Sequence, residues 1–391
     1  MMPGRITILA GAHVVHHDVV ERRDICFADG AVVGAADDTA FRMDLSGHLI
    51  FPGLINAHDH LQLNGVPRLE HSAKFANSYE WIAAMTEHRR RPDVEDAVRV
   101  PLAERLWHGA LKNALSGATT VAHHDPFDLS ISDAEFPVRV PSDMGWAHSL
   151  GLGGADDQSP EPYGPDVRAS FAATPAHRPW VIHLAEGTDE RAASELGVLD
   201  ALGALAANSV LVHGVGLTGG DVRLIVERGA AVVWCPSSNL SMFGATLDPR
   251  GLIAAGRLAL GTDSTLTGSR GLLDELRIAS ACAELSGVEA VRLVTADGSR
   301  VLREARAGNL AVGSYADCVI LPDAADPHAA LVRARRSALR AVIRGGRPLV
   351  ADPDFAPLFE ACDVPATSIV LDGRPKLIAS SMLRYGDRLP A

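Results

Sequence analysis

The sequence predicts an α/β protein in which a barrel of parallel strands lies beside a small β-sandwich made from both ends of the chain. Between residues 51 and 307, short apolar runs alternate with segments whose apolar residues have helical spacing. Such alternation is typical of a parallel sheet, and this many repeats favour a (β/α)8 barrel of the TIM type over an open sheet. In residues 1–50 and 308–391, short strands and turns replace the alternation. We expect these two end segments to pair in one composite sandwich.

The composition excludes several classes of partner. The chain has 391 residues, 47% of them hydrophobic, and a formal net charge of −12 at pH 7, which argues against a polyanionic partner such as nucleic acid. No stretch has the pattern of a transmembrane span or a secretory signal. The five cysteines are odd in number and form no C-x-x-C pair, as is typical of reduced thiols. We therefore expect a cytoplasmic protein that binds neither nucleic acid nor membranes.

Both ends of the chain alternate short apolar runs with turns. Asp29-Gly30 is a good hairpin signal in the first segment, and Arg344-Gly345-Gly346-Arg347 and Asp372-Gly373-Arg374 indicate hairpin turns in the second. The first segment is too short to be a stable domain alone. The strands that we expect cover residues 6–9, 24–27 and 31–33 in the first segment and 318–321, 341–344 and 368–371 in the second.

The barrel is expected to begin within the apolar run at residues 49–55, which predicts a buried strand, and to continue through strand–helix repeats. Helical spacing of apolar residues predicts helices over 81–88 and 93–116. The segment over 138–179 is short for two strand–helix units, so we expect one unit of the barrel to be reduced or missing. The predicted strands cover residues 119–122, 180–183, 209–213, 231–235 and 258–263 and, with weaker signals, 138–140 and 146–150.

Residues of the metal-binding types stand at the ends of several predicted strands. Side chains at i and i+2 of a strand point to the same face, so His58 and His60 converge just beyond the first strand. The carboxyl ends of parallel barrel strands share one rim, where imidazole and carboxylate groups can bind zinc or iron. A single histidine that closes a strand is usually structural, but packing explains a whole set poorly. The set comprises His58, His60, His123, His124, His183, His213 and Asp263.

Five motifs follow one another along the chain: Pro52-Gly53-Leu54-Ile55-Asn56-Ala57-His58-Asp59-His60, His183-Leu184-Ala185-Glu186, His213-Gly214, Cys235-Pro236-Ser237-Ser238-Asn239 and Gly261-Thr262-Asp263-Ser264. In this order and spacing they resemble the amidohydrolase superfamily, and most closely its cytosine deaminase and atrazine/s-triazine hydrolase branch. The resemblance covers nearly the whole chain, because residues 308–317 resemble the segment that re-enters the sandwich in that family. The motifs are specific for the superfamily and poorly specific for the substrate.

The resemblance implies a role for each site residue. One divalent metal ion, zinc by preference and iron as the alternative, would leave a coordination position open for water. Glu186 would carry a proton from that water to the leaving group. His213 would form a hydrogen bond with the water or with the tetrahedral intermediate, and Asp263 would also accept the proton of the water. The metal ligands implied by the resemblance are His58, His60, His183 and Asp263.

The positions of the lysines favour one metal ion over two. Two-metal members of the superfamily bridge their ions with a carboxylated lysine at a strand end. The three lysines here are Lys74, which follows the first motif, Lys112, within a predicted helix, and Lys376, in the tail. None has the required position, so we expect a mononuclear site. Asp59 replaces the threonine more usual between the two histidines, and strand alternation turns it away from the metal, so we expect a structural role for it.

The expected activity is hydrolysis of a non-peptide C–N bond in a small molecule, by deamination of a cyclic amidine or an amino-substituted heterocycle. Hydrolysis of a cyclic or side-chain amide, or of a halide on a triazine-like ring, is the alternative reaction. A scaffold without activity would not need the proton shuttle Glu186, and neither would a metal or ligand sensor. We expect a homodimer. Side chains expected to contact the substrate are Gln62, His124, Trp146 and His148, each of which could instead be a solvated or capping residue.

Overall fold

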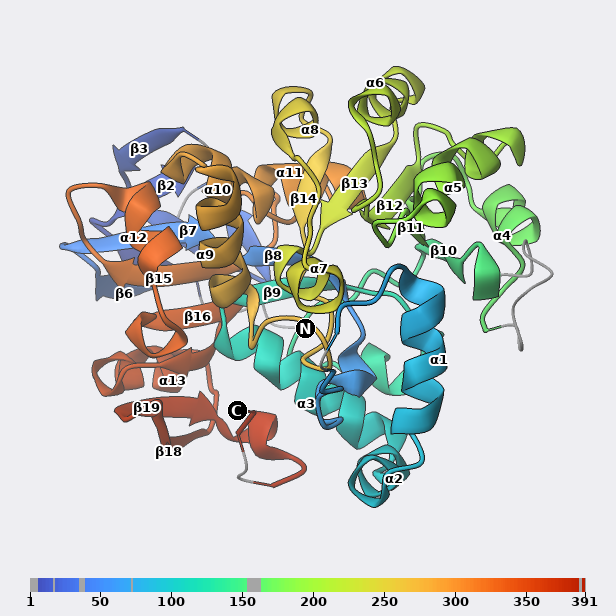
Figure 1. Ribbon diagram of the computed structural model, residues 1–391. Helices are drawn as coiled ribbons and strands as arrows, with labels where there is room; N and C mark the ends of the chain where they lie inside the picture. The colour runs from blue at the N-terminus through green and yellow to red at the C-terminus, as the bar shows by residue number, and fades with distance from the viewer. Residues whose placement is uncertain are drawn as a thin grey trace.

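The computed structural model describes residues 6–390 apart from 17, 35–38, 72, 153–162, 387 and 388. These residues form a mixed α/β architecture, in which parallel strands and their helices lie beside two mainly antiparallel sheets (Figure 1). The parallel strands come from the middle of the chain, and the antiparallel sheets come from its two ends. The α/β class predicted from the sequence is therefore confirmed at this level.

The parallel strands of the central region end at the candidate site. Their bounds are Leu54–Asp59 (β8), Ala118–His123 (β9), Gly145–Ser149 (β10), Trp180–Leu184 (β11), Ser209–His213 (β12), Ala231–Trp234 (β13) and Leu258–Leu260 (β14). Strands β10 to β14 pair in sequence order in one sheet, and β8 pairs with β9 in a second sheet. The two sheets meet after β14, where the backbone N–H groups of Thr262 and Asp263 donate to the carbonyl of His58 at 3.0 and 3.1 Å.

In the segment between β9 and β10, only one residue pairs with β9: Arg139 forms a single parallel bridge with Thr120. Arg139 donates to the carbonyl of Thr119 at 2.8 Å, and its carbonyl accepts from Val121 at 2.9 Å. Pro137 and Pro141 flank this position, and proline cannot donate to a ladder, so the strand predicted over 138–140 is reduced to one bridge. Over the described residues the parallel strands therefore form two sheets and no closed eight-stranded barrel.

The helices follow the strands and cover the outside of the parallel sheets (Figure 1). Their bounds are Ser78–His88 (α1), Pro92–Arg99 (α2), Leu102–Leu115 (α3), Val167–Ala173 (α4), Glu190–Ala201 (α5), Gly219–Arg228 (α6), Pro236–Phe243 (α7), Arg250–Ala254 (α8), Leu272–Ala283 (α9), Gly287–Leu293 (α10), Ala296–Leu302 (α11), Pro327–Arg333 (α12) and Ala356–Ala361 (α13). The prediction of one helix over 93–116 is wrong. Val100 leaves the helical region with ψ of 133°, because Pro101 disfavours helical backbone in the residue before it.

Local sequence signals fix several helix ends. The Asp189 side chain accepts from the backbone N–H of Ala192 and so caps α5. Thr218 and Asp221 form a capping box at the start of α6, which Gly229 ends in a left-handed conformation, with φ of 74°. These caps place α5 and α6 directly after β11 and β12, so the loops that leave those strands are short and well defined.

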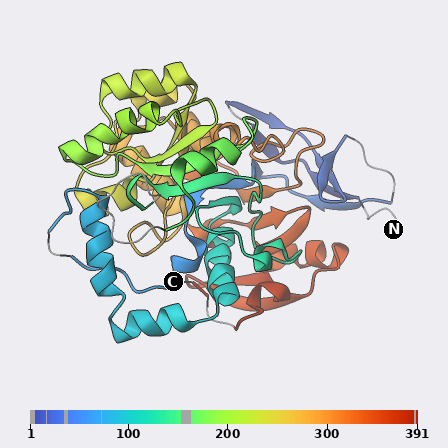
Figure 2. The same ribbon diagram turned by 90° about the vertical axis from the view of Figure 1, so that its right-hand side faces the viewer.

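The two ends of the chain share a sheet. Strands β7 (His48–Pro52) and β15 (Cys318–Pro322) pair antiparallel, with Phe51 opposite Val319. Leu49, Ile50 and Phe51 are completely buried at this junction. Figure 2 shows the N-terminal and C-terminal strands side by side. The other end strands are β1 Thr7–Ala10, β2 His13–His16, β3 Val19–Arg22, β4 Ile25–Ala28, β5 Ala31–Val33, β6 Phe41–Asp44, β16 Ala341–Arg344, β17 Arg347–Ala351, β18 Ala366–Leu371 and β19 Arg374–Ala379.

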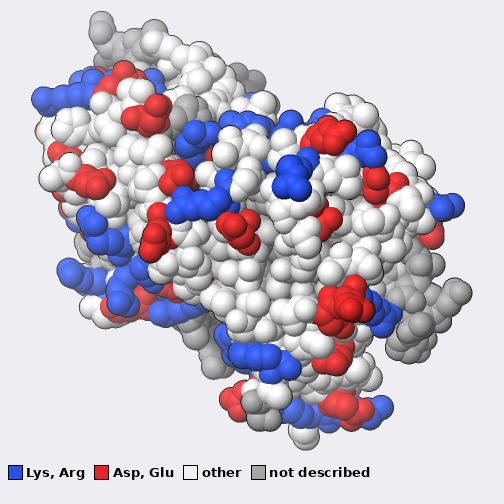
Figure 3. Space-filling view, turned by 45° about the horizontal axis from the view of Figure 1, so that its top comes forward, with Lys and Arg blue, Asp and Glu red and all other residues white. Residues whose placement is uncertain are grey.

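These strands form an eight-stranded sheet in the order β18, β19, β17, β16, β15, β7, β2, β3, and a four-stranded sheet in the order β5, β4, β1, β6. The six end strands predicted from the sequence are confirmed to within two residues, and β2, β3, β6, β17 and β19 were not predicted. In the described part of the chain no helix is long and apolar enough to cross a membrane. On the face drawn in Figure 3, positive and negative side chains are interspersed.

Candidate metal centre and active site

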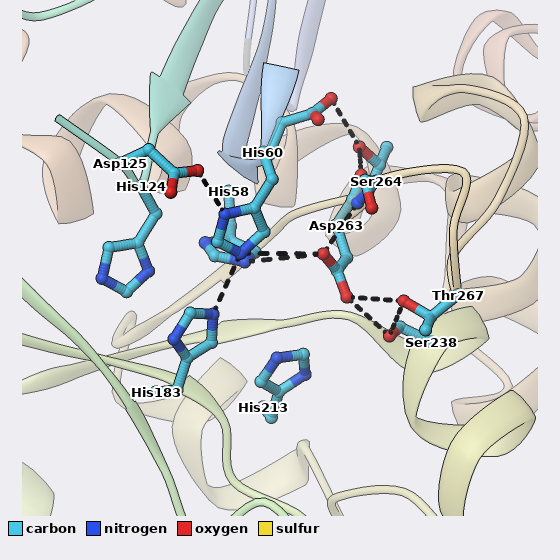
Figure 4. Close-up of polar contacts among 12 residues, drawn as sticks. His58, His60, His124, Asp125, His183, His213, Ser238, Asp263, Ser264 and Thr267 are labelled. Carbon is cyan, nitrogen blue, oxygen red and sulfur yellow. Dashed lines mark hydrogen bonds and ion pairs between the residues drawn. The ribbon is translucent and has the colours of Figure 1, made fainter. Parts of the chain in front are cut away.

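Four histidine side chains meet in a buried cluster at the ends of the parallel strands. One ring nitrogen from each of His58, His60, His124 and His183 lies within 4.8 Å of the other three. The Oδ1 atom of Asp263 lies 4.0 Å from Nε2 of His58 and 3.9 Å from Nε2 of His60, and His60 stands at the centre of the group (Figure 4). The structure thus brings together the four expected ligands and adds His124.

The backbone adopts a left-handed conformation at the ends of several strands that carry these side chains. Ala185, His213 and Asp263 follow or end β11, β12 and β14, and all three have left-handed backbones, with φ of 52°, 77° and 55°. Residues other than glycine rarely adopt this conformation, which costs of order 1–3 kcal/mol and is concentrated at functional sites. The turn at Ala185 brings Glu186 to the same rim as His183.

The hydrogen bonds of the rings leave nitrogen lone pairs that face one another. Nδ1 of His60 donates to Asp125 Oδ2 at 2.6 Å, and Nδ1 of His183 donates to the carbonyl of His148 at 2.6 Å. In neutral rings with these hydrogens, both Nε2 atoms are unprotonated, yet they lie only 3.2 Å apart. Neither ring nitrogen of His58 has a hydrogen-bond partner among the described residues. A divalent metal ion fits this set, because it satisfies several buried imidazole lone pairs at once.

The charges around the cluster also favour a cation. Burial lowers the pKa of His58 and of His183 well below the usual value, which keeps these rings in the neutral, ligating form. Burial would lower the pKa of His60 as well, but the carboxylates of Asp125, Asp263 and Asp59 raise it to about 9. The carboxylates therefore stabilise positive charge at His60, and a divalent ion supplies that charge without protonating the ligands.

Asp263 is held in place by hydrogen bonds to both of its carboxylate oxygens. Its Oδ2 atom accepts hydrogen bonds from the hydroxyls of Ser238 at 2.7 Å and Thr267 at 2.9 Å, and its Oδ1 atom accepts from the backbone N–H of Ser264 at 2.7 Å. Burial raises the pKa of Asp263, but the charges of His60 and His213 and these hydrogen bonds outweigh it, so the pKa is lowered. Asp263 is thus an oriented carboxylate whose Oδ1 atom faces the imidazoles.

Glu186 and His213 form the second functional pair. The Nε2 atom of His213 lies 3.5 Å from Oε1 of Glu186, and its Nδ1 atom donates to Asn239 Oδ1 at 2.8 Å. Burial raises the pKa of Glu186 well above its usual value, and the charges of Asp263 and Glu195 raise it further. A buried carboxyl group with a raised pKa keeps its proton to a higher pH than a solvated one and can release it to a basic nitrogen.

A cavity of about 460 Å³ opens above this group. Its floor is formed by His60, His183, Glu186, His213 and Asp263, and its walls include the apolar side chains of Trp81, Ile82, Met85, Leu152, Met242 and Leu266. Gln62 and His148, two of the expected substrate contacts, line the cavity. The other two, His124 and Trp146, do not line the cavity; their rings meet edge-on with centroids 5.8 Å apart. A larger cavity of about 870 Å³ lies elsewhere and includes none of the expected ligands.

Asp59 points away from the imidazoles into a buried polar network. Its Oδ2 atom accepts from Lys112 Nζ at 3.0 Å, and its Oδ1 atom accepts from Asn64 Nδ2 at 2.8 Å. Further hydrogen bonds to the Oδ2 atom come from Asn56, Asn113 and Thr262. The network joins β8 and α3 to the segment that follows β14, so the segments that carry His58, His60 and Asp263 are anchored to it.

Several functional contacts were not predicted. Asp125 binds the ligand His60, and its Oδ1 atom accepts from the hydroxyl of Tyr163 at 2.6 Å. Ser238 and Asn239 orient Asp263 and His213. The His-His-Asp sequence after β9 was a usable signal for Asp125. No local pattern marks Tyr163, because it reaches the site from a distant loop.

Fold and site together define an α/β protein with a metal centre at the carboxyl ends of parallel strands. Residues 161–349 match the model of the amidohydrolase family. A 5-methylthioadenosine/S-adenosylhomocysteine deaminase of Halobacterium salinarum is 27% identical over 90% of this chain and 94% of its own length, and one of Pyrococcus furiosus is 23% identical over 87% and 91%. These matches confirm the resemblance to the amidohydrolase superfamily that was seen in the motifs.

Solved structures show the same fold. A zinc-bound adenosine deaminase from Xanthomonas campestris aligns with a TM-score of 0.68 at 22% identity, over 92% of this chain and 97% of that one. Atrazine chlorohydrolase from Arthrobacter aurescens, complexed with zinc, aligns with a TM-score of 0.70 at 19% identity, over 88% and 95%. These likenesses extend over nearly the full length of each protein.

Proposed function

We propose that this chain is a metal-dependent deaminase that hydrolyses a non-peptide C–N bond of an amino-substituted heterocycle or a cyclic amidine. The observation that carries the proposal is the position of Glu186, which lies beside His213 on the floor of a cavity that also exposes His60, His183 and Asp263. This arrangement puts a proton-carrying acid next to the group that can bind a metal. The similarity to 5-methylthioadenosine/S-adenosylhomocysteine deaminases supports the same reaction class.

The proposed ligands are His58, His60, His183 and Asp263, and zinc is the proposed ion, with iron as the alternative. The neutral imidazoles, the unpartnered His58 nitrogens and the oriented Asp263 carboxylate fit such an ion. When bound, a divalent ion makes water nucleophilic near neutral pH and polarises the carbon under attack.

The remaining steps belong to the side chains. Asp263 Oδ1 faces the imidazoles and would accept a proton from the attacking water. His213 donates through Nδ1 to Asn239, so its Nε2 atom can accept a hydrogen bond from that water. Glu186 would take up a proton from the water and deliver it to the departing nitrogen, because an amine leaves poorly as an anion. Burial raises the pKa of Glu186, which favours the protonated form that makes this delivery.

The cavity suits a flat ring with polar edges. Trp81, Met85, Met242 and Leu266 supply apolar walls, and Gln62 and His148 supply polar groups at the edge. The similar proteins are named for adenosine derivatives and for the triazine atrazine, which are amino-substituted nitrogen heterocycles. We therefore propose Gln62 and His148 as substrate contacts. Trp146 and His124, also expected to contact the substrate, do not line the cavity. We therefore propose that Trp146 acts indirectly, through the contact of its ring with that of His124.

The proposal is tested by ammonia release from a panel that includes adenosine, 5′-methylthioadenosine, cytosine and an aminotriazine. Zinc-loaded protein should deaminate at least one of them, and chelator-treated protein should regain the activity when zinc is returned. His177→Ala, at an exposed histidine outside the cluster, is the matched control for His58→Ala, which should lose metal and activity. Chloride release from a chlorotriazine without ammonia release would favour the alternative reaction and contradict the proposal.

Further features of the chain remain proposals. The joint sheet of β7 and β15 supports a division into residues 1–50 with 308–391 and residues 51–307. We regard the parallel strands as a (β/α)8-type barrel with one reduced unit, supported by the single bridge at Arg139. A cytoplasmic location and a homodimer are also proposed. Size-exclusion chromatography with light scattering tests the dimer.

A further inference from the structure

We propose that His124 is an additional ligand of the metal ion, beside His58, His60, His183 and Asp263. This inference rests on the metal dependence proposed above and deepens it, because it gives the site a ligand that the motif resemblance does not imply. The Nδ1 and Nε2 atoms of His124 differ sharply in their surroundings, and this difference carries the argument.

The Nδ1 atom of His124 is buried without a partner. The side chain has no exposed surface, and Nδ1 has no hydrogen-bond partner among the described residues. Buried polar atoms are nearly always paired, since leaving one unpaired is destabilising. A bound cation removes this cost.

The other nitrogen fixes the tautomer. Nε2 of His124 donates to the carbonyl of Ala147 at 2.9 Å, so the neutral ring carries its hydrogen on Nε2 and a lone pair on Nδ1. Histidines that bind metals usually donate their second ring nitrogen in this way, which orients the ring. His183 has the same arrangement, with its Nδ1 atom on the carbonyl of His148.

The ring of His124 also lies close enough to the other three histidines to share a metal ion with them. A ligating nitrogen of His124 lies within 4.8 Å of those of His58, His60 and His183. Its ring stacks on that of His183, with centroids 4.3 Å apart and planes at 22°, and meets the ring of His58 edge-on at 5.2 Å. Contact with substrate would explain the residue less well, because His124 does not line the cavity.

Two substitutions of His124 test the roles of its two ring nitrogens separately. In His124→Gln, the side-chain amide can still donate to the carbonyl of Ala147, but nothing replaces Nδ1. In His124→Asn, the amide oxygen can occupy the Nδ1 position, but the donor to Ala147 is lost. His123→Gln is the matched control, since His123 is the preceding residue, is also buried and lies outside the cluster. Zinc affinity is measured by competition with a chelator, and coordination by the visible absorption of the Co²⁺-loaded protein.

We expect His124→Gln to bind zinc at least about tenfold more weakly and to give a stronger Co²⁺ absorption band, because the band intensifies as coordination number falls. His124→Asn should retain more of the affinity, and His123→Gln should equal the wild type. Equal affinities and equal Co²⁺ spectra in the wild type and both His124 variants would overturn this inference alone. A change in KM for substrate without any change in the Co²⁺ spectrum would also overturn it, in favour of substrate contact. Failure of the wild type to bind any metal would instead overturn the proposed function. Melting temperatures of the metal-free proteins identify a variant that fails to fold, in which case the other variant decides.

Discussion

The ammonium group of Lys112 lies 3.0 Å from the Oδ2 atom of Asp59, and both side chains are almost completely buried. Asp59 stands between the proposed ligands His58 and His60, and Lys112 comes from the last turn of α3. Lys112 also donates to Asn64 Oδ1 at 2.7 Å. The ion pair therefore anchors β8 on the face opposite to the one on which the two histidines lie.

Removal of one partner should be far more harmful than removal of both. Lys112→Met leaves the Asp59 carboxylate buried without its countercharge, and such a change typically costs about 3–5 kcal/mol of unfolding free energy. The measurement is urea-induced unfolding of the metal-free protein. The double variant Asp59→Asn with Lys112→Met should be more stable than Lys112→Met alone.

The exposed pair of Glu95 and Arg99 is the control for this prediction, because surface ion pairs contribute little and these side chains are 46% and 70% exposed. Arg99→Met should leave the unfolding free energy almost unchanged. If Lys112→Met is as mild as Arg99→Met, the buried pair does not have the role described here.

Asp125 should act on the metal through His60. Asp125→Ala removes the carboxylate that holds His60 Nδ1 at 2.6 Å, and loss of such an orienting group typically weakens metal binding by about tenfold to a hundredfold. Tyr163→Phe removes only the hydrogen bond to the other oxygen of Asp125, so its effect on zinc affinity should be smaller. Chelator competition measures both, and wild-type affinity in Asp125→Ala would refute this role.

Motifs and strand periodicity predicted most of what positions the site. His58, His60, His183 and Asp263 could be placed together because parallel strands end at one rim, and the short segment before Pro179 predicted a reduced or missing unit, which remains a proposal. Periodicity alone could not show that Arg139 keeps only one bridge, since the effect of Pro137 and Pro141 depends on a partner strand. Pro101 was a signal for a helix break, but the helical spacing of the apolar residues continues across it, and so one helix was predicted.

Contacts between distant segments could not be predicted in the same way. Lys112 was placed correctly in a helix, but its pairing with Asp59 depends on how α3 packs against β8. The substrate contacts show the same limit. His124 and His148 are both polar residues near strand ends, and only the three-dimensional packing puts His148 on the cavity and His124 within the histidine cluster.

Glu195 should make stability depend on pH. Its Oε2 atom accepts from the backbone N–H of Ala185, and burial raises its pKa from 4.5 to about 7. Between these values the folded state holds a proton that the unfolded state has released. The unfolding free energy should therefore fall as pH rises from about 4.5 to about 7, and this contribution should level off above it.

Glu195→Gln resembles the protonated side chain and cannot titrate. Urea unfolding of wild type and variant at several pH values should show the wild type losing stability relative to Glu195→Gln across this interval. Parallel pH profiles for the two proteins would contradict the prediction.

The proton shuttle assigned to Glu186 is the central claim of this account. Glu186→Gln keeps the size of the side chain and can still form hydrogen bonds, but it cannot carry a proton. Glu190→Gln, at an exposed position four residues later on α5, is the matched control. Zinc content and melting temperature should stay near those of the wild type in both variants. The decisive measurement is kcat for ammonia release from the best substrate of the panel. It should fall by roughly two to four orders of magnitude in Glu186→Gln and stay unchanged in Glu190→Gln, whereas turnover by Glu186→Gln close to the wild-type rate would contradict the mechanism.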